Sequence, residues 1–123
     1  MVEKEAVAPE DRGKIARVIY NRLHLGMNLG IDATTRYGLH IPPTQSLTAS
    51  ELASTNPYNT RNPTIVGLPP TPIANPGLAS IQAAAHPASG PWIYFVRKPD
   101  HVHHFFTASD VEFENYLAAH GYG

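Results

Sequence analysis

Cysteine is absent from this sequence of 123 residues. Its absence excludes disulfide bonds and thiolate metal sites, and it leaves the redox state of the compartment unread. Charge is also scarce, because only 15% of the residues are charged and the formal net charge is −1. Since no basic stripe or arginine-rich run occurs, nucleic acid is not expected as a partner.

Long hydrophobic runs are lacking as well. The sequence has no stretch of 18 apolar residues and no basic-then-apolar signal, so we expect this chain alone to carry no membrane segment and no targeting signal. It has instead 12 prolines and 9 glycines, which gather in clusters. This pattern indicates a single ordered domain over residues 1–123 with long, shaped loops.

The first five residues contain two carboxylates, Glu3 and Glu5, on either side of Lys4. We expect them on a short helix that ends before Pro9. Residues i and i+2 do not share a helix face, so at most one of the two acids should face a cleft. We take Glu5 as that acid, because a carboxyl group that both gives and takes a proton can serve acid–base catalysis. A solvated, charged helix start is the plain alternative.

Hydrophobic periodicity and capping signals predict the helices. Apolar residues at Ile15, Val18, Ile19 and Leu23 form one stripe, which predicts a helix over about residues 9–25. Further helices are expected from about residue 33, over about 49–53, over about 77–85 and up to about 119, with caps assigned to Asp32, Thr48, Asn75 and either Ser109 or Asp110.

One aromatic and β-branched run, Trp92–Val96, is typical of a strand, and the segment 103–107 is its expected partner. The turn residues between them favour an antiparallel pair. The fold class is therefore α+β, with four or five helices packed around a small antiparallel sheet whose strands lie near residues 92–97 and 103–107.

Two adjoining loops, residues 56–61 and 67–77, combine proline with asparagine, threonine and tyrosine. Proline fixes φ and cannot donate a hydrogen bond to a sheet, so these loops hold their side chains in place at low entropic cost. Such stiffness suits the wall of a binding site. A proline-rich connector is the alternative interpretation.

Three histidines, His101, His103 and His104, lie close together in the sequence. An H-x-H pair can bind zinc when a third ligand comes from elsewhere. However, the H-E-x-x-H helix motif is absent and no acid sits at a familiar spacing, so we assign no metal site and expect no cofactor. His104 begins an aromatic strand and is the one we expect to line a cleft.

Several motifs occur together in one order. They are Val2-Glu3-Lys4-Glu5, Tyr20-Asn21-Arg22-Leu23, Asp32 with Thr34 and Tyr37-Gly38, Pro57-Tyr58-Asn59-Thr60, Gly67-Leu68-Pro69-Pro70, Pro72-Ile73-Ala74-Asn75-Pro76-Gly77, Tyr94-Phe95-Val96 and His104-Phe105-Phe106. Over about residues 2–117 the chain resembles the catalytic domain of the YceG-like family, the endolytic murein transglycosylases.

The resemblance implies an enzyme that cleaves peptidoglycan glycan strands internally, between N-acetylmuramic acid and N-acetylglucosamine, and leaves a 1,6-anhydro end. It places the catalytic acid on Glu5, whose pKa we expect burial to raise. The residues we expect to hold the substrate are Asp32, Thr34, Tyr58, Asn59, Thr60, Asn75 and His104. Full-length relatives work at the extracytoplasmic face of the cell membrane, with the cell-wall synthesis machinery as a further expected partner.

The chain departs from the family pattern in three places. Relatives have more helix before Glu3, a LysM-like region and a membrane anchor; Asp32 is followed by Ala33 where proline is commoner; and Gly30 stands where glutamine is frequent. A first helix cut short leaves Glu5 near free N–H groups that favour its ionised form, so slow turnover is expected. Two alternatives therefore stay open: a fragment that binds peptidoglycan without cleaving it, and a metal-dependent hydrolase that uses the histidine cluster.

Overall fold

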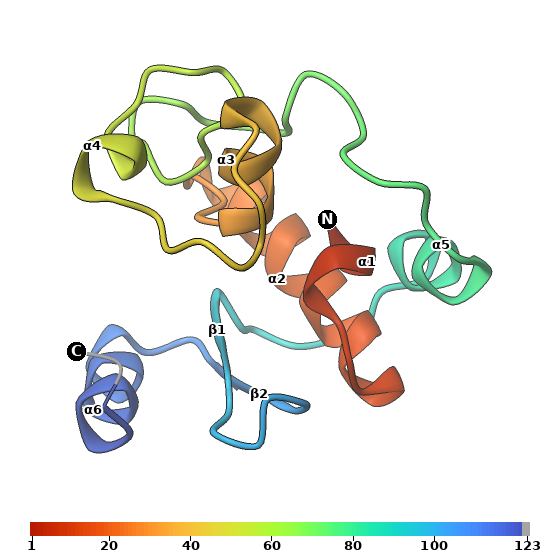
Figure 1. Ribbon diagram of the computed structural model, residues 1–123. Coiled ribbons are helices and arrows are strands. Elements are labelled where there is room, and N and C mark those ends of the chain that lie inside the picture. Colours follow the sequence, from red (N-terminus) through yellow and green to blue (C-terminus); the bar gives the residue numbers. More distant parts are fainter. Residues whose placement is uncertain (122–123) are drawn as a thin grey trace. The chain divides into compact units, whose positions relative to one another are not determined.

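A computed structural model describes residues 1–121, so the last two residues of the expected 1–123 domain lie outside this range. The chain divides into two compact units, and each is described here by itself. The elements in chain order (Figure 1) are α1 (Val2–Glu5), a 3-10 turn η1 (Pro9–Asp11), α2 (Arg12–Leu25), α3 (Asp32–Leu39), α4 (Ala49–Leu52), α5 (Leu78–Ala85), β1 (Tyr94–Arg97), β2 (His104–Thr107) and α6 (Asp110–Ala119).

Helices and one antiparallel strand pair make up the regular structure of residues 1–121, which confirms the α+β class. The strands β1 and β2 fall within the expected ranges, and their register pairs Tyr94 with Thr107 and Arg97 with His104. No helix among the described residues is both long enough and apolar enough to cross a bilayer.

The first unit consists of Met1, residues 3–5 and residues 22–75. Its apolar core includes Leu29, Ile31 and Ile73, each less than 10% exposed. The start of α4 confirms the expected capping box, because Thr48 accepts a hydrogen bond from the Glu51 N–H while the Glu51 carboxylate accepts one from the Thr48 N–H.

Two expected caps in this unit are wrong. Asp32 is the first residue of α3 and not its cap, because Ile31 is the extended residue before the helix and Asp32 turns its carboxylate to Arg61. Asn75 does not cap α5 either. Gly77 is extended, with φ −73° and ψ 167°, so the helix begins only after it and Asn75 stays outside.

The second unit consists of Val2, residues 6–21 and residues 76–121. Its core confirms three positions of the stripe expected on α2, since Ile15, Val18 and Ile19 are all buried. Ala16 and Ala83 are buried with them, and their small side chains let neighbouring backbone approach closely. The predicted helix over 9–25 is present as η1 followed by α2.

Polar groups spaced four residues apart on α2 bind the extended segment 88–92. The Ala88 N–H donates to the Gly13 carbonyl (3.1 Å), the Arg17 Nε donates to the Ala88 carbonyl (2.6 Å), and the Asn21 Nδ2 donates to the carbonyls of Gly90 (3.0 Å) and Trp92 (2.8 Å). Residues i, i+4 and i+8 share one helix face, so this stripe fixes the path of the chain into β1.

Aromatic stacking joins α6 to the hairpin. Tyr94 of β1 stacks on Phe113 with ring centroids 4.8 Å apart, and Phe105 of β2 stacks on Tyr116 at 4.1 Å. Ser109 caps α6 by accepting a hydrogen bond from the Glu112 N–H, as expected. These contacts give a two-stranded sheet the covered face that it needs for stability.

Candidate functional site

Glu5 is the last residue of α1 and is half-buried. Its backbone N–H donates to the Met1 carbonyl at 3.1 Å, and Val2, at 8% exposure, anchors the helix. Burial lowers the pKa of the Met1 amino group, while the carboxylates of Glu5 and Glu3 oppose this shift. The Glu5 carboxylate therefore lies within electrostatic reach of Met1, in a partly desolvated position.

A cavity of about 280 Å³ lies within the first unit, lined by Met1 and by residues 68–73 of the proline-rich loop. The hydroxyl groups of Tyr58 and Thr71 are hydrogen-bonded at 2.8 Å, so Tyr58 is attached to the wall of this cavity. The cavity is thus lined by the residue that precedes α1 and by the proline-rich loop, to which Tyr58 is hydrogen-bonded. Glu5 and the residues expected to hold substrate are not among its lining residues.

Asn59 lies at the centre of the loop before that wall and is fully buried. Its Nδ2 donates to the carbonyls of Leu52 (3.1 Å) and Ser54 (2.7 Å). Its Oδ1 accepts from the Thr35 hydroxyl (2.9 Å) and from the Arg61 N–H (3.2 Å). An amide side chain has two donor hydrogens and two acceptor lone pairs, so these four bonds use all of its capacity.

Thr34 and Thr60 form a second buried group. Their hydroxyl oxygens are 2.8 Å apart, and both hydroxyls also bond the Ile31 carbonyl, at 2.9 and 3.0 Å. The Ile31 N–H in turn donates to the Thr60 Oγ1 at 2.8 Å. Because both side chains are at most 1% exposed, they join the start of α3 to the loop and present no surface to a ligand.

Asp32 and Asn75 differ from these residues in being accessible. The Asp32 carboxylate is 45% exposed and its Oδ1 accepts from the Arg61 Nε at 2.7 Å. Asn75 lies in the exposed stretch between the cavity wall and α5. Of the seven residues expected to hold substrate, Asp32, Tyr58 and Asn75 therefore keep side-chain surface that a ligand can reach.

His104 belongs to the second unit, whereas the other sequence-predicted residues belong to the first. Its side chain is 1% exposed and packs against the rings of Phe95 and Phe106. Its backbone N–H donates to the Asp11 Oδ2 at 2.9 Å, and the same oxygen lies 3.3 Å from Nδ1. Burial lowers the pKa of His104, and the contact with Asp11 works against this shift.

His103, the next residue back, is held between two carboxylates. Its Nδ1 lies 2.7 Å from Asp100 and its Nε2 lies 3.1 Å from Glu10, and the hydrogen bond with Asp100 is the main reason that its pKa is raised. His101 occupies a left-handed turn position with φ 60°. Within residues 1–121, no three or more histidine, cysteine or acidic side chains are arranged to hold a metal ion.

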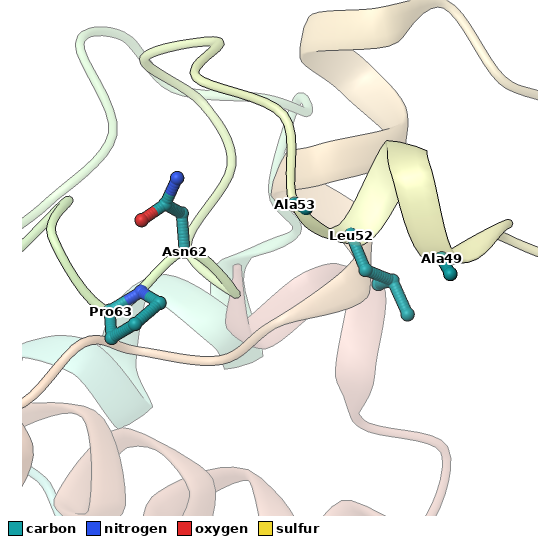
Figure 2. Close-up of a pocket in the computed structure, with 5 residues that line it drawn as sticks. All are labelled: Ala49, Leu52, Ala53, Asn62 and Pro63. Carbon is teal, nitrogen blue, oxygen red and sulfur yellow. The ribbon is translucent and has the colours of Figure 1, made fainter.

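A second concave region of about 420 Å³ in the first unit contains none of the expected residues. Figure 2 shows that Ala49, Leu52 and Ala53 come from α4 and its end, and that Asn62 and Pro63 come from the loop. Asn59 is joined to this region by the hydrogen bond from its Nδ2 to the Leu52 carbonyl. The lining is largely apolar and offers no group suited to acid–base chemistry.

Sequence reasoning missed the partners that hold the expected residues. Thr35 bonds Asn59, Thr71 bonds Tyr58, Arg61 bonds Asp32, and Asp11 bonds His104. Proximity to a motif could have suggested Thr35 and Arg61. Nothing in the sequence pointed to Asp11, which lies 93 positions from His104.

Comparison with known proteins gives consistent matches. The chain is 42% identical over 100 residues to an endolytic murein transglycosylase of Bacillus subtilis and 35% identical over 100 residues to one of Streptococcus pneumoniae. These alignments cover 80% and 78% of this chain but only 26% and 18% of the relatives. The chain thus spans about a quarter or less of the curated relatives it matches.

A crystal structure of a YceG-like protein from Listeria monocytogenes superimposes with a TM-score of 0.84 and 36% sequence identity. The superposition covers 94% of this chain and 36% of the Listeria chain. The model of the YceG-like family matches residues 1–119, which is nearly the whole sequence. With the fold, the motifs and the family model in agreement, the chain belongs to the YceG-like family.

Proposed function

We propose that this chain is the catalytic part of an endolytic murein transglycosylase, with Glu5 as its acid and base. The observation that carries the proposal is that the family model matches residues 1–119, a range that includes the half-buried Glu5. The backbone N–H of Glu5 donates to the carbonyl of Met1, a residue that lines the cavity. The relatives from Bacillus and Streptococcus named as endolytic murein transglycosylases support it.

The reaction needs one proton donor and no water. Glu5 in its acid form gives its proton to the glycosidic oxygen, and the bond from that oxygen to the anomeric carbon of N-acetylmuramic acid breaks. The 6-hydroxyl oxygen of the same sugar attacks the anomeric carbon, forms the 1,6-anhydro bond and loses its proton to the Glu5 carboxylate. Glu5 ends as it began, and the other product is a free N-acetylglucosamine 4-hydroxyl.

A single carboxyl group is sufficient because the nucleophile belongs to the substrate. Ordinary glycosidases use two carboxyl groups, one of which activates water or attacks the sugar. Here the sugar ring holds the 6-hydroxyl next to the reacting carbon, and intramolecular attack of this kind replaces a second enzymic group.

The remaining expected residues divide into two groups in this proposal. Tyr58, Asp32 and Asn75 have accessible surface and are suited to contact the sugars or their N-acetyl groups. Thr34, Asn59 and Thr60 are buried and fully bonded, so we assign them to positioning the loop and not to binding sugar. His104 is likewise a positioning residue within its own unit.

The experiment is mass spectrometry of the products from purified glycan strands. We expect 1,6-anhydro ends from the wild-type chain, and a loss of roughly 100-fold or more in rate for Glu5→Gln, the scale of general acid–base catalysis. Glu3→Gln is the matched control, since it changes the same kind of group two residues away on α1. Equal rates for Glu5→Gln and the wild type would remove Glu5 from the mechanism.

A second candidate is binding of peptidoglycan with little turnover. Intact strands that co-sediment with the chain would support it, and anhydro products would exclude it. Cleavage that stops when a chelator is added, with reducing ends in place of anhydro ends, would instead indicate a metal-dependent hydrolase. In the complete protein we propose the extracytoplasmic face of the membrane as the location, with the cell-wall synthesis machinery as a partner.

A further inference from the structure

Two guanidinium groups of the first unit converge at Gly30. This residue has φ +65°, and a Cβ placed on it would lie 3.1 Å from the Arg22 Nη1 and 3.8 Å from the Arg61 Nη1. The first distance is tighter than an ordinary van der Waals contact and the second is an ordinary one, so both guanidinium groups lie close against the backbone of Gly30.

Arg61 is held in position, but its outer nitrogens are not used. Its Nε donates to the Asp32 Oδ1 at 2.7 Å, and its backbone N–H donates to the buried Asn59 Oδ1 at 3.2 Å. Its side chain is 45% exposed, and within residues 1–121 neither Nη makes a hydrogen bond to the protein. A guanidinium has five N–H donors, so Arg61 presents the four on its Nη atoms to a ligand.

Arg22 supplies a fixed positive charge beside this donor edge. Its Nη1 donates to the carbonyls of Asn28 (2.8 Å) and Leu29 (3.1 Å), which fixes the guanidinium under the loop. Burial lowers the pKa of Arg22, and the positive charge of Arg61 lowers it further. The two positive charges therefore lie close enough to influence each other, and the side chain of Arg61 is 45% exposed.

We propose that Arg61, together with Arg22 beside Gly30, forms a binding site for a carboxylate of the peptides that murein carries on its glycan strands. This inference rests on the proposed function. The planar fork of arginine matches a carboxylate with two parallel hydrogen bonds. The hydroxyl and acetamido groups of the sugars are neutral, and the lactyl carboxyl group of N-acetylmuramic acid is consumed in the amide bond to the peptide. The free carboxylates of a peptide-bearing strand therefore belong to its peptides, and the site selects strands that carry them.

The kinetic experiment compares cleavage of peptide-bearing strands with cleavage of stripped strands, whose peptides have been removed by an amidase and whose lactyl carboxylates, freed by that cleavage, have been converted to amides. For the wild type we expect a KM that is roughly fivefold lower on peptide-bearing strands, the scale of an exposed ion pair. Arg61→Met should raise that KM to the value for stripped strands and leave kcat unchanged. Arg61→Lys should keep part of the preference, because it retains the charge without the fork.

The matched control is Arg36→Met, which removes the same charge from the same unit. The Arg36 Nη1 bonds the Pro42 and Gln45 carbonyls and lies outside the Gly30 site. The Arg36→Met chain should keep the wild-type preference for peptide-bearing strands. A wild-type chain with equal KM for both kinds of strand, or an Arg61→Met chain that keeps the preference, would overturn the inference.

A binding measurement separates this inference from the proposed function. Isothermal titration with a free tetrapeptide stem and with its carboxamide should show tighter binding of the carboxylate form by the wild type and no difference for Arg61→Met. If the chain cleaves neither kind of strand, the proposed function fails, and the titration alone decides the carboxylate site. If it cleaves both and binds both peptides equally, only the carboxylate site is refuted.

Discussion

The two compact units bury their polar groups in different ways. In the first, the most buried polar side chains are Thr34, Thr35, Asn59 and Thr60, which are neutral and bond each other or the backbone. In the second, the most buried polar pair is His104 with Asp11, and both of its members can ionise. The contribution of the first arrangement to stability does not depend on pH, whereas that of the second does.

The two units also differ in where their charged side chains lie. In the first unit, Asp32 and Arg61 are each 45% exposed, so this ion pair is available to a ligand. The second unit has the ionisable pair Asp11 and His104 inside, and its exposed His103 is already bonded to two carboxylates. The accessible charged groups suited to binding a ligand thus lie in the unit whose buried polar side chains are neutral.

The largest effect is expected for Asn59→Ala, which removes the centre of the neutral framework. The change leaves the Thr35 hydroxyl, the Arg61 N–H and two carbonyls without their partner in a buried site, so we expect a loss of about 3 kcal/mol in the free energy of unfolding. Urea denaturation measures this loss. Asn75→Ala, in the exposed stretch of the same unit, is the control and should change stability by less than about 0.5 kcal/mol.

A smaller effect is expected for Asp11→Ala in the second unit. The change removes the acceptor for the buried backbone N–H of His104, so we expect a loss of about 2 kcal/mol in the free energy of unfolding. Asp11→Asn keeps an oxygen at the same place and should cost roughly half as much. If Asp11→Ala proved as stable as the wild type at pH 7, the stabilising role of the buried Asp11 carboxylate in the second unit would be contradicted.

The smallest effect concerns pH and His103. Its pKa is raised mainly by the hydrogen bond with Asp100, so its contribution to stability is fully present below the ordinary imidazole pKa of about 6.5 and is lost as the pH rises through the folded-state value. We expect His103→Gln to lower the melting temperature at pH 5.5 more than at pH 9. Salt should shrink this difference, because the group is exposed.

The contribution of His104 to stability should depend on pH in the opposite direction to that of His103. Burial lowers its pKa, so its contribution is present above about pH 6.5 and is lost as the pH falls through the folded-state value. Melting curves of His103→Gln across this range should therefore show the loss of stability on acidification more clearly than those of the wild type. A melting temperature for His103→Gln that falls equally below the wild type at pH 5.5 and pH 9 would contradict the assignment for His103, and a His103→Gln melting temperature that does not fall on acidification would contradict the assignment for His104.

Local signals in the sequence predicted much of the fold. The helix over 9–25, the capping box of Thr48 with Glu51, the Ser109 cap and both strands follow from contacts within a few residues, and the structure confirms them. The Asn75 cap failed because the conformation of Gly77 decided where α5 begins, and glycine has little preference of its own. The catalytic assignment to Glu5 stays a prediction.

What the sequence by itself determined is the class of fold, the family motifs and the candidate acid, because these depend on residue type and short spacing. Only the tertiary structure decided which motif residues face inward. Asn59, Thr60 and His104 look like ligand-binding residues in the sequence, yet each has a polar atom bonded to a partner that lies 24 to 93 positions away. A buried polar group must find its hydrogen bonds wherever the folded chain supplies them, and no local pattern encodes that choice.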